Sequence, residues 1–258
     1  MKYEKRSYRD LIDRGGRFFY RVTVKETDLY VHTVPPMENR TRDLVLQYRG
    51  YIENYISQFP EFAKSLNPWH IRGPVPNVIR DMAEAGIKAG VGPMAAVAGA
   101  VAESVGSDLL KHSREVIVEN GGDIFLKTDA PVTLAIYAGK SPLSLKVGLR
   151  VNPAEKPLGV CTSSGTVGHS LSLGKADAVC VVSDSCALAD AAATAIGNHV
   201  KSKSDIQNAI AFGKSIEGIS GLVVIISDKM GMWGDIELVP VHNPLCHEDT
   251  KAQSFTKI

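Results

Sequence analysis

The chain has 258 residues, so it can bury roughly three quarters of its unfolded surface in one large domain or in two closely packed lobes. Its 29 Lys and Arg residues nearly balance its 28 Asp and Glu residues, which excludes the strongly basic surface of a dedicated nucleic-acid-binding protein. The charged N-terminal segment lacks the apolar core of a signal peptide or lipoprotein anchor, and no segment is long and apolar enough to span a membrane. We therefore expect no membrane partner.

The first third of the sequence predicts a hairpin and two helical zones. Residues 18–33 alternate between apolar and polar side chains around a polar turn, which predicts an antiparallel hairpin. From Thr41, apolar residues recur mostly at three- and four-residue spacing until Pro60, which predicts a long amphipathic helix. Residues 81–107 form a second helical zone, rich in Ala, Gly and Val. It is either a helix buried against a sheet or one whose first amides receive a phosphate.

The remainder predicts strands separated by short connections, then helices and a closing hairpin. A Ser-Asp pair at 204–205 is expected to begin a helix that runs to about residue 216. The segments GLVVIIS and DIELVPV predict a hairpin around the glycine-bearing turn DKMGMWG. This mixture predicts an α+β fold, with mainly antiparallel sheets packed against helices, over a single domain at 1–258. The expected central strands are residues 115–119, 124–127, 132–138, 145–151 and 178–183.

The stretch CTSSGTVGHSLSLGKADAVCVVSDSCALADAAATAIGN, residues 161–198, is the most informative part of the chain. Asp190 and Thr194 stand four apart in a helix of small residues, so their side chains project from one face. Neither residue favours a helix interior, which suggests that both are kept for a ligand such as Mg2+. The alternative is that Asp190 is a buried structural acid whose partners depend on it.

Two further segments carry candidate binding groups. Gly121, Gly122 and Asp123 form a turn in which paired glycines permit positive φ and close approach of a ligand, although an ordinary hairpin turn would have the same composition. The hydroxyl-rich loop of Thr162, Ser163, Ser164 and Gly165 is followed by a histidine, His169, and this combination suits phosphate handling.

The cysteines carry a separate hypothesis. Cys161, Cys180, Cys186 and Cys246 lack CxxC spacing and lie among apolar or small residues, so we expect free thiols in the cytoplasm. Cys161 lies beside the hydroxyl loop, where a thiolate could attack an activated group or carry sulfur. The alternative is a small buried residue.

From about residue 93 to the C-terminus, these motifs resemble the ApbE-like superfamily of flavin transferases, which move the FMN part of FAD to a threonine or serine of a target protein. The similar segments are VENGGDI, the TSSG loop with its downstream histidine, and ADAAATAI. The resemblance implies that Asp190 and Thr194 coordinate Mg2+ with help from backbone oxygens. It also implies that the glycine turn and the TSSG loop help to bind the flavin dinucleotide.

Two family features are missing. The lysine-glycine pair that opens a helix in well-characterised transferases is replaced by GVGPMAAVAG, and their histidine-proline segment by HSLSLGKAD. The chain is therefore similar to a cytoplasmic archaeal and anaerobe branch, which has been linked with sulfide assimilation and homocysteine synthesis.

Three hypotheses follow. The first is an Mg2+-dependent enzyme acting on FAD, as a transferase or a pyrophosphatase, with His169 as a candidate acid or base. The second is a sulfur-transfer protein that uses Cys161 and interacts with a sulfur-pathway partner. The third is a flavin or nucleotide binder without catalysis. Small-residue helices and hairpin edges are also compatible with a homodimer.

Overall fold

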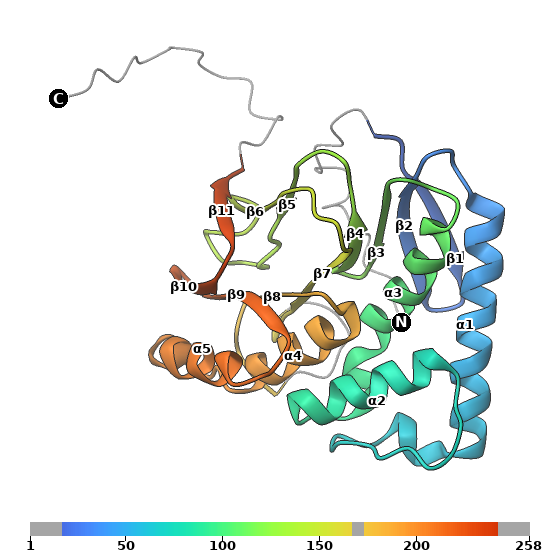
Figure 1. Ribbon diagram of the computed structural model, residues 1–258. Helices are drawn as coiled ribbons and strands as arrows, with labels where there is room; N and C mark the ends of the chain where they lie inside the picture. Colours follow the sequence, from blue (N-terminus) through green and yellow to red (C-terminus); the bar gives the residue numbers. More distant parts are fainter. Residues whose placement is uncertain (1–16, 167–172, 242–258) are drawn as a thin grey trace.

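The computed structural model describes residues 17–166 and 173–241, which form two sheets and a layer of helices (Figure 1). The larger sheet has eight strands in the order β1-β2-β3-β4-β7-β8-β9-β10, and every neighbouring pair is antiparallel. The smaller sheet has three antiparallel strands in the order β11-β6-β5. The predicted α+β fold with mainly antiparallel sheets is confirmed.

The strands of the larger sheet are β1 Tyr20–Val24, β2 Thr27–Thr33, β3 Val116–Asn120, β4 Asp123–Lys127, β7 Leu158–Ser163, β8 Ala178–Ser183, β9 Ile219–Ile226 and β10 Lys229–Gly234. Those of the smaller sheet are β5 Val132–Ala135, β6 Val147–Val151 and β11 Glu237–Pro240. The α-helices are α1 Glu38–Gln58, α2 Asn77–Ala89, α3 Val97–Leu110, α4 Cys186–Asn198 and α5 Ile206–Lys214. Short 3-10 helices cover η2 Pro60–Ala63, η3 Pro93–Ala96 and η4 Lys203–Asp205.

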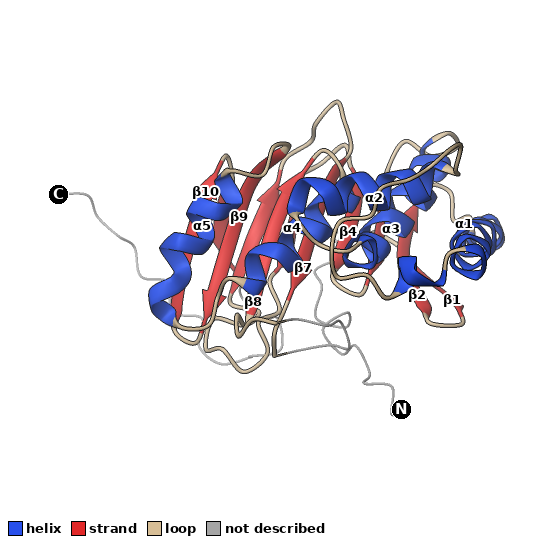
Figure 2. Ribbon diagram, turned by 90° about the horizontal axis from the view of Figure 1, so that it is seen from below, coloured by secondary structure: helices blue, strands red, loops and turns tan. Residues whose placement is uncertain are grey.

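The helices cover one face of the large sheet, as Figure 2 shows, and α4 packs on β7 and β8 while α3 packs on β3 and β4. The main apolar core lies between this helical layer and the sheet. A second core is built from the opposite face of the large sheet together with residues of the small sheet. Strands between the two cores, such as β8, are buried along their whole length, which in β8 explains the apolar run of its first five residues, AVCVV.

The N-terminal predictions are confirmed in type and corrected in detail. The hairpin is β1 and β2, and the amphipathic helix is α1, which begins three residues before Thr41. The helical zone at 81–107 contains two helices with a break between them, and Gly92 and Pro93 stand in the order typical of the start of the second. Gly90 caps α2, and the chain turns before Pro93 opens η3.

Two predictions near β7 and β10 were wrong. Thr162 and Ser163 lie in strand β7 rather than in a loop, because their backbone groups pair with β8. The segment predicted as the closing turn is instead mostly strand β10, because the chain reverses earlier, at residues 227–228, and β10 pairs with β9. The strand β11 pairs with β6 in the smaller sheet. The N-cap expected at Ser204 is also shifted, because Ser202 forms a capping box with Asp205 at the start of η4, which leads directly into α5.

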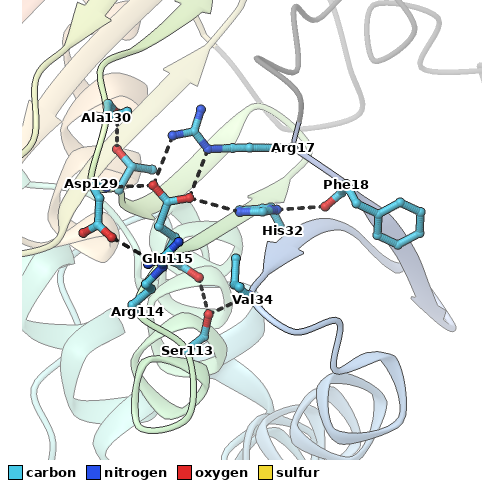
Figure 3. Close-up of polar contacts among 10 residues, drawn as sticks. Arg17, Phe18, His32, Val34, Ser113, Arg114, Glu115, Asp129 and Ala130 are labelled. Carbon is cyan, nitrogen blue, oxygen red and sulfur yellow. Dashed lines mark hydrogen bonds and ion pairs between the residues drawn. The ribbon is translucent and has the colours of Figure 1, made fainter.

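A buried carboxylate, Glu115, ties the start of β3 to β2 and to the segment before β1 (Figure 3). Its oxygens accept hydrogen bonds from the Arg17 guanidinium at 3.1 and 3.3 Å and from the backbone N–H of Asp129 at 2.8 Å. The His32 ring lies between this carboxylate and the carbonyl of Phe18, at 3.4 and 2.8 Å. Burial raises the pKa of Glu115, but these hydrogen bonds and the Arg17 charge outweigh it and lower the pKa below 4.5.

Within residues 17–166 and 173–241 no single helix has the length and apolar character needed to cross a membrane. The helix α2 and the segment Pro93–Leu110 meet those criteria only when taken together, and they are bent by 107° at their break.

The Glu115 network predicts a pH-dependent contribution to stability. Glu115→Ala should lower the free energy of unfolding at pH 7 by about 2 to 4 kcal/mol, because it leaves the part-buried Arg17 guanidinium and the Asp129 amide without their acceptor. A carboxyl with a lowered folded pKa stabilises above its unfolded pKa, so the difference from wild type should shrink as the pH falls below 4.5. Urea denaturation at pH 7 and pH 4 measures both effects.

The matched control is Glu237→Ala, which removes an exposed ion pair with Arg150 at 3.8 Å. This change should stay within about 0.5 kcal/mol of wild type. An equal loss in both variants would contradict the special role of Glu115.

Candidate functional site

Four segments meet between the large sheet and the helices: the β3–β4 turn, the C-terminal end of β7, the helix α4 and the N-terminus of α3. We call this the acid-pair site, after Asp123 and Asp190. α3 and α4 pack side by side beneath β4 and β7 (Figures 1 and 2). The side-chain amide of Asn120 donates to the carbonyl of Ala98 at 3.0 Å, which fixes the turn against the start of α3.

The glycine turn is a tight two-residue reversal. Asn120 pairs with Asp123, and between them Gly121 and Gly122 have φ of 72° and 108°, which side-chain-bearing residues rarely adopt. The buried carboxylate of Glu119 accepts the N–H of Gly122 at 2.9 Å. That amide is therefore already used within the protein, and the turn offers fewer anion-binding groups than its sequence indicates.

The small-residue helix α4 is held at its start by Ser185, whose hydroxyl accepts the N–H of Leu188 at 3.3 Å. Its Ala side chains are buried, and only its polar residues break the apolar surface. Asp190 and Thr194 project from one face, as their spacing predicts, and Thr194 Oγ1 lies 3.5 Å from Ser163 Oγ. The structure thus brings Thr194, one of the two predicted metal ligands, next to the predicted hydroxyl segment at the end of β7.

Asp190 has a second role that the sequence did not reveal. Its Oδ2 accepts the N–H of Gly99 at 2.9 Å, and the N–H of Ala98 also donates to it. These amides belong to the first turn of α3, which has no side-chain cap of its own. Asp190 is therefore a cap supplied from another helix, as well as a candidate metal ligand.

The two acids of the site influence each other's protonation. Burial and the neighbouring charge of Asp190 raise the pKa of Asp123 well above its ordinary value, although Cys161 and the Thr162 backbone donate hydrogen bonds to it. Burial raises the pKa of Asp190 to about 7, despite the two donated amides. Asp123 is buried and Asp190 is part-buried, and two such carboxyl groups that disfavour their charged forms would both gain from a bound cation.

The donor set fits Mg2+ by its chemistry. Asp123 and Asp190 supply carboxylate oxygens, and Ser163 and Thr194 supply hydroxyls, which are the hard oxygen ligands that this ion prefers. The described residues contain no group of three or more His, Cys, Asp or Glu side chains able to hold a metal ion. A site here would therefore depend on hydroxyl, backbone or ligand oxygens in addition to the two acids.

Cys161 is fully buried beneath the acid pair. Its sulfur lies 3.3 Å from the carbonyl oxygen of Cys186 and 3.4 Å from that residue's sulfur. Burial, the neighbouring Cys186 thiol and the two acids raise the pKa of the Cys161 thiol well above its ordinary value. These surroundings favour a neutral, unreactive thiol and agree with the alternative of a small buried residue.

Of the remaining predicted residues, Ser164 and Gly165 lie within the described part of the chain and His169 does not. Ser164 and Gly165 follow β7, where Ser164 Oγ accepts the N–H of Thr166 at 3.1 Å and Gly165 donates its N–H to Ala176 at 2.9 Å. His169 lies outside the described residues, so its part in the site stays a prediction.

Sequence reasoning missed Asn120 and Glu119 as organisers of the turn and Glu103 as a partner of α4. Glu103 Oε2 accepts the N–H of Ala187 at 3.0 Å and the hydroxyl of Ser185 at 3.1 Å. The available signal was a lone carboxylate in the segment AVAGAVAESVG, where other residues are small or apolar.

The chain matches known proteins over most of its length. The model of the family described as AbpE bacteria matches residues 9–232. A UPF0280 protein from Methanocella arvoryzae is 42% identical over 221 residues, which cover 85% of this chain and 90% of that protein. A UPF0280 protein from Methanocaldococcus jannaschii is 41% identical over 229 residues, covering 86% of this chain and 93% of that protein.

Solved structures show the same fold at low identity. The apo flavinyl transferase ApbE of Pseudomonas stutzeri superposes with a TM-score of 0.55 at 14% identity, covering 84% of this chain and 94% of that one. The flavin transferase ApbE of Vibrio cholerae superposes with a TM-score of 0.52 at 10% identity, covering 84% of this chain and 96% of that one.

The raised pKa of Asp190 leads us to predict that, in metal-free buffer, the free energy of unfolding falls as the pH rises. The folded pKa of Asp190, about 7, exceeds the ordinary 3.8, so the folded state holds a proton that the unfolded chain releases between these values. Asp190→Asn keeps an oxygen for the Gly99 N–H and removes the charge. Between pH 5 and pH 8, wild type should lose on the order of 1 to 3 kcal/mol more than the variant. Chemical denaturation with a chelator present measures this difference.

Asp184→Asn is the control, because it makes the same chemical change on an exposed residue just before α4. It should leave the pH dependence of wild type intact. If Asp190→Asn also followed the wild-type curve, Asp190 would not be the group that takes up the proton.

Proposed function

Because the chain belongs to the AbpE bacteria family, and so to the ApbE-like superfamily, we propose that it is an Mg2+-dependent enzyme that cleaves the pyrophosphate of FAD. FMN would pass to a hydroxyl of an acceptor protein or to water, and AMP would leave. The observation that carries the proposal is the acid pair Asp123 and Asp190, set beside the hydroxyls of Thr194 and Ser163.

The residues around the acid pair would each have a limited task. Asp190 and Thr194 would hold Mg2+, which would supply positive charge to the pyrophosphate oxygens when bound. Ser163 lies 3.5 Å from Thr194 and would orient that hydroxyl or contact the same ligand. Asp123 would remain hydrogen-bonded to the Thr162 backbone, which keeps its carboxyl directed at the site.

The glycine turn would border the ligand-binding site and would contribute few hydrogen-bond donors to the ligand. A Cβ atom at Gly122 would lie 3.5 Å from the carbonyl of Thr162, so this turn packs closely along β7. With the Gly122 amide held by Glu119, phosphate oxygens would depend on the cation and on hydroxyls rather than on a nest of turn amides. The lack of a free amide at Gly122 supports an enzyme that requires Mg2+ to bind the anionic part of its substrate.

The sulfur-transfer hypothesis has less support from the site. A persulfide carrier needs an accessible thiolate, whereas Cys161 is fully buried and its thiol pKa is raised.

The test is incubation of the purified protein with FAD and Mg2+, followed by mass analysis for FMN and AMP. We expect turnover that a chelator abolishes and that Asp190→Asn reduces at least about 100-fold, because a ligand charge is removed while the helix cap is kept. Calorimetry should show a parallel loss of Mg2+ affinity.

Cys161→Ser separates the flavin and sulfur hypotheses, since a serine hydroxyl cannot carry a persulfide. FAD turnover should survive this change. Flavin binding without AMP release would identify a binder rather than an enzyme. Sulfide-dependent labelling that disappears in Cys161→Ser, with no flavin affinity in the wild-type protein, would refute the proposal.

A further inference from the structure

Helices α3 and α4 cap each other through two carboxylates. Asp190 of α4 accepts the Gly99 N–H in the first turn of α3 at 2.9 Å. Glu103, one turn further along α3, accepts the Ala187 N–H in the first turn of α4 at 3.0 Å. The same oxygen of Glu103 accepts the hydroxyl of Ser185, the N-cap residue of α4, at 3.1 Å. Each helix therefore satisfies free amides of the other.

The two helices are in backbone contact where these caps meet. A Cβ atom at Gly99 would lie 2.3 Å from the carbonyl oxygen of Cys186 and 2.8 Å from the Cβ of Asp190. No side chain separates the helices here, so a small sliding or rotation of α4 along α3 would move the Asp190 carboxylate directly. The Glu103 bonds to Ala187 and Ser185 oppose that movement.

We propose that Glu103 is a positioning residue for the acid-pair site, which sets the location of Asp190 and Thr194 through the start of α4. Asp190 follows Ala187 by three residues, so fixing the Ala187 amide fixes the turn of helix from which Asp190 projects. Thr194 lies one further turn along the same face. This inference rests on the proposed metal role of Asp190 and Thr194.

The test compares Glu103→Ala, Glu103→Gln and Asp205→Ala. The third variant is a matched control, because Asp205 also accepts backbone N–H groups, from Lys201 at 2.9 Å and Ser202 at 2.8 Å, at the start of a different helix. Mn2+ is the probe, since it shares the oxygen-ligand preference of Mg2+ and its free ion is counted by electron paramagnetic resonance. Amide hydrogen exchange at Gly99 reports the position of Asp190 without any metal.

We expect Glu103→Ala to weaken Mn2+ binding about ten-fold, as changes to residues behind metal ligands do, and to speed exchange at Gly99. Glu103→Gln keeps an acceptor oxygen and should restore most of both properties. Asp205→Ala should affect neither, although it removes a comparable cap.

Unchanged Mn2+ affinity and unchanged Gly99 exchange in Glu103→Ala would overturn the inference, as would an equal loss of affinity in Asp205→Ala. If the wild-type protein binds no Mn2+, the metal part of the proposed function fails, and Gly99 exchange alone decides the positioning role. Faster exchange in Glu103→Ala would then support it, and unchanged exchange would refute it.

Discussion

The reciprocal capping of α3 and α4 is the constraint on which the acid-pair site depends. Buried helix starts require acceptors for their free amides, and each of these helices takes its acceptor from the other. The arrangement needs glycine at position 99, because any side chain there would collide with the carbonyl of Cys186. It also explains why polar residues persist in two helices that otherwise carry small apolar side chains.

The pKa values of Asp123 and Asp190 are set by their burial and by the groups next to the α3–α4 contact. Asp123, the first residue of β4, is buried and lies close to the part-buried Asp190, so both carboxyls disfavour ionisation. The hydroxyls of Ser163 and Thr194 lie beside them and add neutral oxygen donors. Within the described residues the acids face one another, the N-terminal amides of α3 and the Cys161 thiol, and these donors compensate only part of the repulsion.

Periodicity predicted the elements whose apolar pattern is simple, such as the β1–β2 hairpin and the helix α1. It failed where glycine served packing or strand pairing instead of a turn, as in β10, where Gly231 lies against Ile206 of α5. The spacing of Asp190 and Thr194 predicted a shared face. It could not predict that Asp190 caps α3, since that contact joins residues 91 positions apart. Glu103 was missed for the same reason, because its partners lie 82 and 84 positions away.

The Glu119 carboxylate beneath the glycine turn has a consequence for the order in which ligands can bind. Together with Asp123 and Asp190 it makes three acidic groups around the turn, and it already occupies the Gly122 amide that would otherwise attract an anion. If the site binds a nucleotide as proposed, its phosphate would meet few free donors here and would be repelled by each of these carboxyls that is ionised. Under the proposed function, loading would therefore be sequential: the divalent cation would bind first or would arrive with the nucleotide as a neutralised complex.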